Sequence, residues 1–252
     1  MSTFIWLLIL VIIILLIIGL IQFRTPARLM KSKTAKLILK NTTLGDRLCE
    51  IFYGVFMVSV MIGIINITAS GYGLDIKYVL LILAFGVNIT WGIIDGATSV
   101  YGSLVDKAEE DRLVNSLRRE KQNPQYRDEL KETLESTVVR KLSAEEQSKV
   151  IDMVQRGTPE DIKKYSASRD DLKSFFAIFL MDFICVFPVI IPLYVVDEIK
   201  SAVFWSHFIA VLLFIIIGMT WAKYLNKNIL LAGAAFGILG MVTIAVTFYF
   251  GW

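Results

Sequence analysis

The chain has 252 residues, of which 56% are hydrophobic and only 19% are charged, and its mean hydropathy is +0.63. These values are typical of an integral membrane protein and exclude a soluble enzyme, a nucleic-acid-binding protein and a disordered tail. The charges are concentrated between the apolar stretches, with 30 charged residues within residues 105–172. The formal net charge of +3 therefore describes the loops of a membrane protein and does not indicate a polyanionic partner.

Six apolar stretches are long enough to cross a bilayer as helices, since a span needs about 20 residues. They predict an all-α polytopic membrane protein with an N-terminal anchor and a five-helix core. The first stretch has no basic leader, so we expect an uncleaved anchor rather than a signal peptide. The stretches cover residues 4–23, 51–70, 78–103, 174–196, 202–222 and 229–250.

Basic residues between these stretches predict the orientation of the chain. Residues 24–50 carry seven Lys or Arg side chains against two acids, so we expect this segment in the cytoplasm. The hydrophilic insert then lies on the same side, and both termini lie outside. Four segments follow: an anchor with a basic linker at 1–50, a helix pair at 51–104, a cytoplasmic helical domain at 105–172 and a three-helix bundle at 173–252.

The insert is expected to form short helices. The third span can continue into it until Asn123-Pro124 stops the helix. A second helix is predicted over 126–138, with its apolar side chains on one stripe. Ser143 to Glu146 has capping-box spacing for a third helix that ends at Gly157, and Thr158 to Asp161 predicts a further helical turn.

Three acids of the insert are candidate metal ligands. Asp128, Glu132 and Glu135 lie at positions 0, +4 and +7 of the predicted second helix and so share one face. Carboxylate oxygens suit divalent cations. The alternative is a solvated face with pairs such as Lys131 to Glu135, because neither His nor Cys joins the acids.

Asp95 in the third span and Asp182 in the fourth are the most informative residues, because no span contains a Lys or Arg side chain that could neutralise them. An ionised aspartate in mid-membrane costs on the order of 3 kcal/mol, and protonating it at pH 7 costs roughly 4 kcal/mol. These costs are comparable. Each aspartate is therefore a proton or cation site, or a neutral hydrogen-bond donor.

Helical spacing supplies both aspartates with possible co-ligands. Asn88, Asp95 and Ser99 share one stripe, and Asp182 shares a face with Cys185. We therefore predict a cation site in the cytoplasmic half of the membrane. The alternative is that protonated aspartates only bond neighbouring helices, while glycines allow close packing.

The two cysteines, Cys49 and Cys185, provide no disulfide framework. His207 is expected near the outer end of the fifth span.

Two sequence segments resemble the vacuolar iron transporter family. Gly92-Ile-Ile-Asp95-Gly96-Ala-Thr98-Ser99 is similar to the Asp-Gly membrane motif of that family, although the family carries it on the first core span. Phe187-Pro-Val-Ile-Ile-Pro192 and the remaining apolar stretches resemble its last three spans. The resemblance covers 51–251. It implies a dimeric, proton-driven exporter of Fe²⁺ and related divalent metals, with Asp95 as a membrane ligand and the insert collecting metal.

We therefore expect a transporter of Fe²⁺ or Mn²⁺ with proton exchange at Asp95 and Asp182. The alternative is a non-transporting scaffold whose residues 105–172 bind a cytoplasmic protein. An enzyme is not expected, because the sequence has no metalloprotease motif, phosphate-binding glycine loop or Ser-His-acid grouping. We expect a homodimer in the lipid bilayer of a prokaryotic cell membrane, with divalent metal ions and protons as ligands, no cofactor and no nucleic acid.

Overall fold

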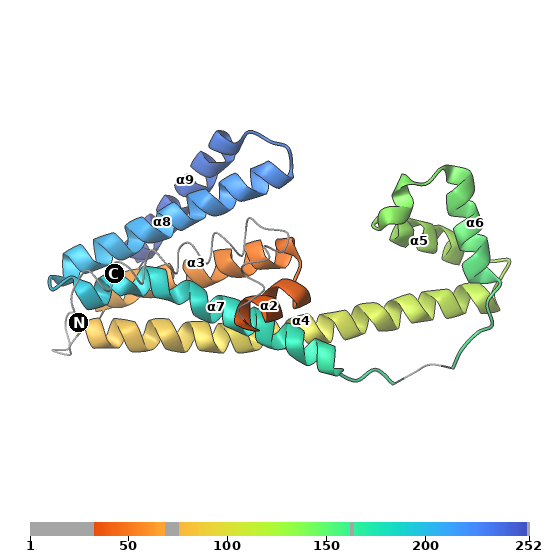
Figure 1. Ribbon diagram of the computed structural model, residues 1–252, viewed down its shortest axis with the longest axis horizontal. Coiled ribbons are helices and arrows are strands. Elements are labelled where there is room, and N and C mark those ends of the chain that lie inside the picture. Colours follow the sequence, from red (N-terminus) through yellow and green to blue (C-terminus); the bar gives the residue numbers. More distant parts are fainter. Residues whose placement is uncertain (1–32, 69–75, 162–163, 251–252) are drawn as a thin grey trace. The chain divides into compact units, whose positions relative to one another are not determined.

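The computed structural model describes residues 33–68, 76–161 and 164–250, and every regular element in these ranges is helical (Figure 1). The all-α prediction is confirmed. In chain order the elements are α2 (Lys33–Asn41), α3 (Leu44–Thr68), α4 (Ile76–Arg119), α5 (Pro124–Glu135), the 3₁₀ helix η3 (Val138–Lys141), α6 (Ala144–Gln155), α7 (Arg169–Val195), α8 (Ile199–Tyr224) and α9 (Ile229–Phe250).

Five of these helices, α3, α4, α7, α8 and α9, are long and apolar enough to cross a membrane. They correspond to the last five of the six expected spans, and the chain is an integral membrane protein. The first expected span, residues 4–23, lies outside the described residues.

Helix α3 begins earlier than the apolar pattern predicts, at Leu44 rather than at residue 51. The cause is a reciprocal cap at its N-terminus. The Thr43 hydroxyl accepts a hydrogen bond from the Asp46 amide at 3.1 Å, and the Asp46 carboxylate accepts one from the Thr43 amide at 2.7 Å. Glu50, expected in a cytoplasmic linker, therefore lies inside the helix.

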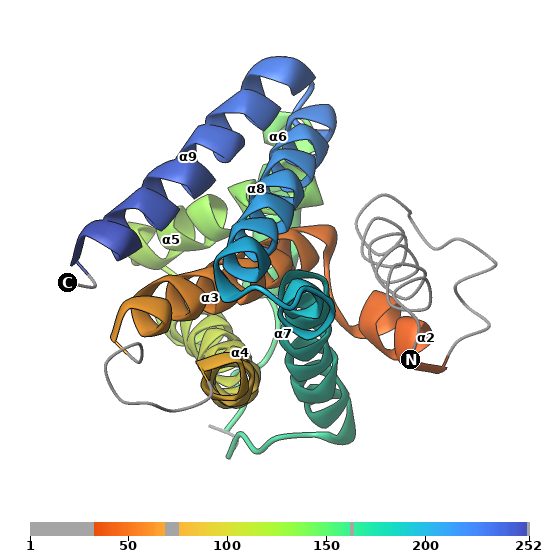
Figure 2. The same cartoon turned by 90° about the vertical axis from the view of Figure 1, so that its left-hand side faces the viewer.

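The chain forms two compact units, one of residues 1–98 with 169–252 and the other of residues 99–168. In the first unit α7 is the central helix, with α3 and α8 packed against it and α9 lying along α8 (Figures 1 and 2). Of the five spans, α7 is the most buried and α9 the least. Because lipid is as apolar as the core, close packing rather than water exclusion holds these helices together.

Helix α2 was not predicted from the sequence. Its Ile38 is fully buried against Ala177, Ile178 and Met181 of α7. The short helix therefore depends on its contact with α7, since an isolated helix of nine residues is not stable in water.

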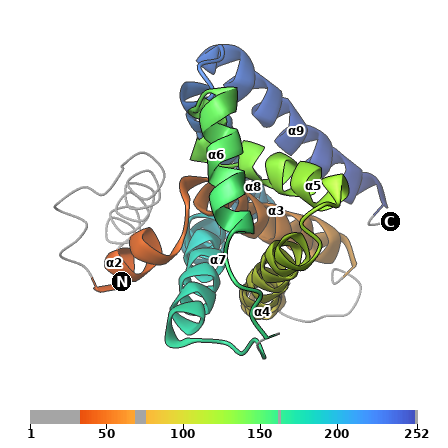
Figure 3. The same ribbon diagram turned by 90° about the vertical axis from the view of Figure 1, so that its right-hand side faces the viewer.

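The second unit has its own small core, formed by Leu117, Leu130 and Ile151, with α5 beside α6 (Figure 3). An ion pair of 2.8 Å between Arg127 and Asp152 links these two helices. The predicted capping box at Ser143 and Glu146 is confirmed.

Two expectations for this unit were wrong. Helix α5 ends at Glu135, so the apolar stripe stops before Val138, whose exposed fraction is 81%. Residues 158–161 form no helical turn. Instead, the Arg118 side chain donates to the carbonyl oxygens of Val154 at 3.1 Å and Thr158 at 3.0 Å, which holds this segment in an irregular conformation.

Candidate metal centre

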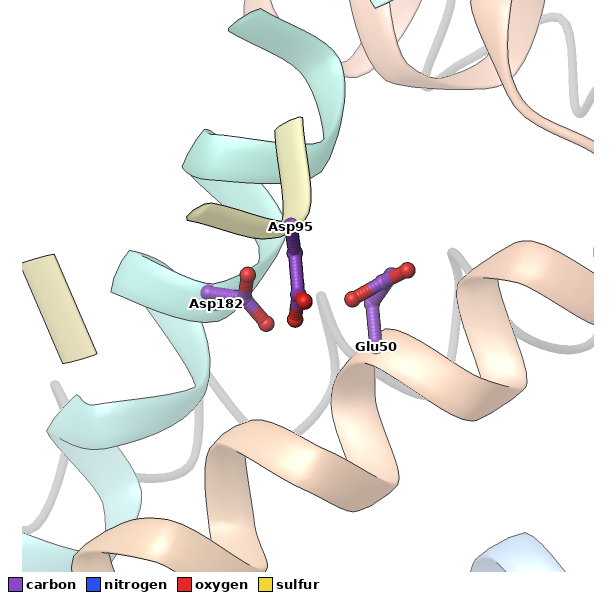
Figure 4. A group of neighbouring side chains, drawn as sticks. All are labelled: Glu50, Asp95 and Asp182. Atoms are coloured by element: carbon purple, nitrogen blue, oxygen red, sulfur yellow. The ribbon is translucent and has the colours of Figure 1, made fainter. Parts of the chain in front are cut away.

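Three carboxylates from three different helices meet within the first unit. Glu50 of α3, Asp95 of α4 and Asp182 of α7 each offer one oxygen, and these oxygens all lie within 4.8 Å of one another (Figure 4). Asp182 is completely buried, whereas Glu50 and Asp95 are partly exposed. Within the described residues, this is the one group of three or more acids, histidines or cysteines with such spacing.

Most oxygens of this group lack a hydrogen-bond partner. Glu50 Oε2, Asp95 Oδ2 and both carboxylate oxygens of Asp182 are buried, and none of them accepts a hydrogen bond from the described residues. Two ionised carboxylates at 4.8 Å repel each other by roughly 3.5 kcal/mol at an effective dielectric constant of about 20. The arrangement therefore calls for a cation or for protons between the carboxylates.

Glycines at the helix crossings bring the three acids together. A Cβ atom at Gly54, one turn after Glu50, would lie 3.1 Å from the Cys185 Cβ atom of α7. A Cβ atom at Gly92 would lie 3.3 Å from the Asp182 Cβ atom, and one at Gly96 would lie 3.0 Å from the Phe175 carbonyl oxygen. Helices α3 and α4 thus both approach the backbone of α7 closely beside the acids.

The sequence identified two of the three acids. Asp95 and Asp182 stood out because they interrupt apolar spans, and the structure brings them together. Glu50 was missed because it was assigned to the basic linker. The capping pattern from Thr43 to Asp46 could have revealed it, since a helix that starts there carries Glu50 in its second turn.

The other predicted membrane ligands are not members of this three-acid group. Asn88 is fully buried, donates to the Ala84 carbonyl oxygen at 3.1 Å and leaves its own Oδ1 atom without a partner. Cys185 is buried beside Gly54 but is not one of the three clustered residues. Ser99 is exposed. Their role as ligands remains a prediction.

The acids of the insert do not converge with other ligand groups. Asp128, Glu132 and Glu135 are all exposed on α5, and the part of this unit that the structure describes holds no three-residue cluster of acids, histidines or cysteines. Metal binding by these three acids also remains a prediction.

His207 lies in the third turn of α8, which is the fifth expected span. It is buried between α8 and α3, with Nδ1 at 3.0 Å from the Val203 carbonyl oxygen and Nε2 at 3.2 Å from that of Ser59. These contacts give the imidazole a role in holding two helices together, apart from the acids.

The chemistry of the three-acid group suits a divalent cation. Oxygen ligands at 2.0–2.6 Å from one ion lie at most about 5 Å apart, so oxygens within 4.8 Å of one another can coordinate the same ion after little movement. Carboxylates without a soft ligand bind Mg²⁺, Ca²⁺, Mn²⁺ and Fe²⁺.

Comparison with known proteins identifies one family. The model of the VIT family matches residues 102–252, which is more than half of the chain. The matched region includes Asp182, the insert and the last three spans, but neither Glu50 nor Asp95. No curated protein and no solved structure matches the chain.

Proposed function

Because the chain belongs to the VIT family, whose members are membrane transporters of metals such as iron and manganese, we propose that it exports Fe²⁺ or Mn²⁺ from the cytoplasm. The proposed binding site is formed by Glu50, Asp95 and Asp182. The observation that supports it is the convergence of three carboxylates, with most of their oxygens unpartnered, inside membrane-crossing helices.

Proton exchange is part of this proposal. A carboxylate must be deprotonated to coordinate a metal ion, so metal binding releases protons. When the metal leaves, repulsion among the three carboxylates favours the uptake of protons again. The same three side chains therefore serve as metal ligands and as proton carriers at different stages of the cycle.

The proposed direction follows from the charge distribution. The basic segment before α3 and the charged insert favour a cytoplasmic location for both, with both termini outside. Glu50 lies near the start of α3, and Asp95 lies toward the insert end of the apolar part of α4. Both acids thus lie near the ends of their spans that are expected to face the cytoplasm, and this position supports loading of the site from the cytoplasmic side.

Reconstituted vesicles test the proposal. We expect Glu50→Gln, Asp95→Asn and Asp182→Asn each to reduce proton-driven Mn²⁺ and Fe²⁺ flux by at least about tenfold, because each removes a charged ligand worth on the order of 1.4 kcal/mol or more. Asp106→Asn, which removes an exposed acid from the same chain, is the matched control. Flux at the wild-type rate in all three variants would refute the proposal, and no flux in the wild type would favour the scaffold alternative.

A further inference from the structure

The amphipathic helix α2 presents a row of lysines away from its packed side. Lys33, Lys36 and Lys40 are spaced by three and four residues, so they share one face of the helix. All three are exposed, whereas Ile38 is buried against α7. Helix α2 therefore attaches to the transmembrane helices through one side and offers positive charge on another.

These lysines line an open cavity of about 510 Å³ together with Lys173, which α7 contributes from its first turns. The remaining lining residues are Leu37, Asn41 and Asp170. Asp170 pairs with Lys173 at 2.5 Å. Four lysines against one aspartate give the lining a formal charge of +3.

Nothing in α2 itself balances these charges. Its sequence, Lys-Thr-Ala-Lys-Leu-Ile-Leu-Lys-Asn, contains no acid, and Lys36 and Lys40 are like charges at i and i+4. Such a like-charged pair destabilises a helix, and α2 is already short. An anion in the cavity would relieve this repulsion.

The cavity lies at the N-terminal end of α7, where the expected membrane span of this helix begins. The apolar run of α7 begins directly after Lys173, and Phe176, one turn further along, is an exposed large apolar side chain. Lysine side chains at the end of a membrane span can reach the phosphate layer of the bilayer.

We infer that this lysine cavity binds the phosphate headgroup of an anionic phospholipid. The recognised chemistry is a phosphate anion, which Lys side chains bind as point charges. A lipid is favoured over a soluble phosphate by the position of the cavity at the end of a membrane span. The inference does not depend on metal transport.

Native mass spectrometry of the full-length protein in detergent tests this inference, with dioleoyl phosphatidylglycerol, dioleoyl phosphatidylcholine and inorganic phosphate as probes. We expect preferential binding of phosphatidylglycerol. At about 1 kcal/mol for each basic residue, the double variant Lys36→Gln/Lys40→Gln should bind it roughly 25-fold more weakly. Lys223→Gln/Lys227→Gln, which removes two exposed lysines near the α8–α9 turn, should change binding less than twofold.

Asp170→Asn gives a change of opposite sign. Removing the one acid of the lining should strengthen phosphatidylglycerol binding roughly fivefold, a gain that a misfolded variant would not produce. The inference would be overturned if both double lysine variants lost phosphatidylglycerol binding equally, or if the wild type bound phosphatidylcholine as well as phosphatidylglycerol. It would also be overturned if millimolar inorganic phosphate displaced phosphatidylglycerol. The last outcome would identify a site for soluble anions instead.

Discussion

Asp182 combines complete burial with two carboxylate oxygens that accept no hydrogen bond from the part of the chain that the structure describes. A buried charge without a partner destabilises a fold, and it persists where a ligand compensates for it. At this position the requirements of metal binding and of stability therefore oppose each other.

Asp182→Asn should reveal this opposition. Without metal and at alkaline pH, where the empty site no longer holds its protons, the variant should be more stable by about 1–3 kcal/mol, because the amide removes one charge and offers a donor to Glu50 and Asp95. For a chain of this size that is a rise in melting temperature of roughly 2–4 °C per kcal/mol. Mn²⁺ should raise the melting temperature of the wild type but not that of the variant.

Thermal unfolding in detergent, with and without Mn²⁺, measures both effects. Asp106→Asn should leave the metal-induced shift intact. A variant that melts below the metal-free wild type yet still responds fully to Mn²⁺ would contradict the role given to Asp182.

Single residues also mark the limit of what the sequence could predict about the site. Asp95 and Asp182 are conspicuous in sequence because an acid within an apolar run needs a partner. Glu50 is not conspicuous, because it stands beside basic and polar residues. Its proximity to the other acids results from the close approach of α3 and α7 at Gly54, which is a tertiary feature.

At the scale of the helices, the crossing of α3 and α7 fixes the separation of Glu50 and Asp182. We expect Gly54→Ala to destabilise the protein and to weaken Mn²⁺ binding by several-fold. The added Cβ atom would meet the Cys185 Cβ atom at 3.1 Å and the Asp182 carbonyl oxygen at 3.4 Å. Both belong to a buried part of α7 that has little room to move.

Gly86→Ala is the matched control for this crossing. No atom of the described residues lies within 4 Å of a Cβ atom at Gly86, so the alanine should be neutral or stabilising by up to about 1 kcal/mol through helix propensity. Melting temperatures and Mn²⁺ titrations of the two variants give the comparison. Equal behaviour of the two would show that the α3–α7 crossing does not control the site.

The N-terminus of α6 should respond to acid. The backbone amide and the hydroxyl of Ser143 both donate to the Glu146 carboxylate at 2.8 Å, and these hydrogen bonds hold the pKa of Glu146 below its usual value of 4.5. A pKa lowered by folding means that the cap stabilises the helix fully above about pH 4.5 and loses this effect as the pH falls through the folded-state pKa. Glu146→Ala should therefore increase amide exchange in α6 at pH 7, and the difference from the wild type should vanish at strongly acidic pH.

Hydrogen exchange of the intact protein, corrected for the intrinsic pH dependence, measures this effect. Glu145→Ala removes a neighbouring charge that pairs with Lys149 and leaves the Ser143 contacts intact. A pH-independent difference for Glu146→Ala would rule out the cap as its cause.

Helix boundaries could be predicted where bilayer thickness or local capping determines them. The apolar runs predicted five described spans because a membrane helix must cover about 30 Å, and the Ser143 capping box is local. Helix α2 and the irregular segment after α6 could not be predicted, because they depend on contacts of Ile38 with α7 and of Arg118 with distant carbonyl oxygens.

At the scale of the whole molecule, the two compact units should respond differently to metal. Ligand binding stabilises the elements that hold the ligand, and the clustered acids lie on α3, α4 and α7 of the first unit. We expect Mn²⁺ to slow amide exchange in these helices and to leave α5 and α6 unchanged. Hydrogen exchange with mass spectrometry measures this, and Asp182→Asn with Mn²⁺ is the control.

Protection of α5 by Mn²⁺ would contradict this expectation. It would instead support metal binding by Asp128, Glu132 and Glu135, and with it the metal collection by the insert that the family resemblance implies. The homodimer, which rests on the same resemblance, likewise remains a prediction.

Charge neutrality of the three-acid site fixes the stoichiometry of the proposed exchange. A divalent ion balances two of the three carboxylates, so an uncharged loaded site keeps one proton and an uncharged empty site holds three. Cycling between these forms trades one metal ion for two protons and is electroneutral. Under this scheme, an imposed membrane voltage leaves the turnover rate unaltered, and the two concentration gradients alone drive it.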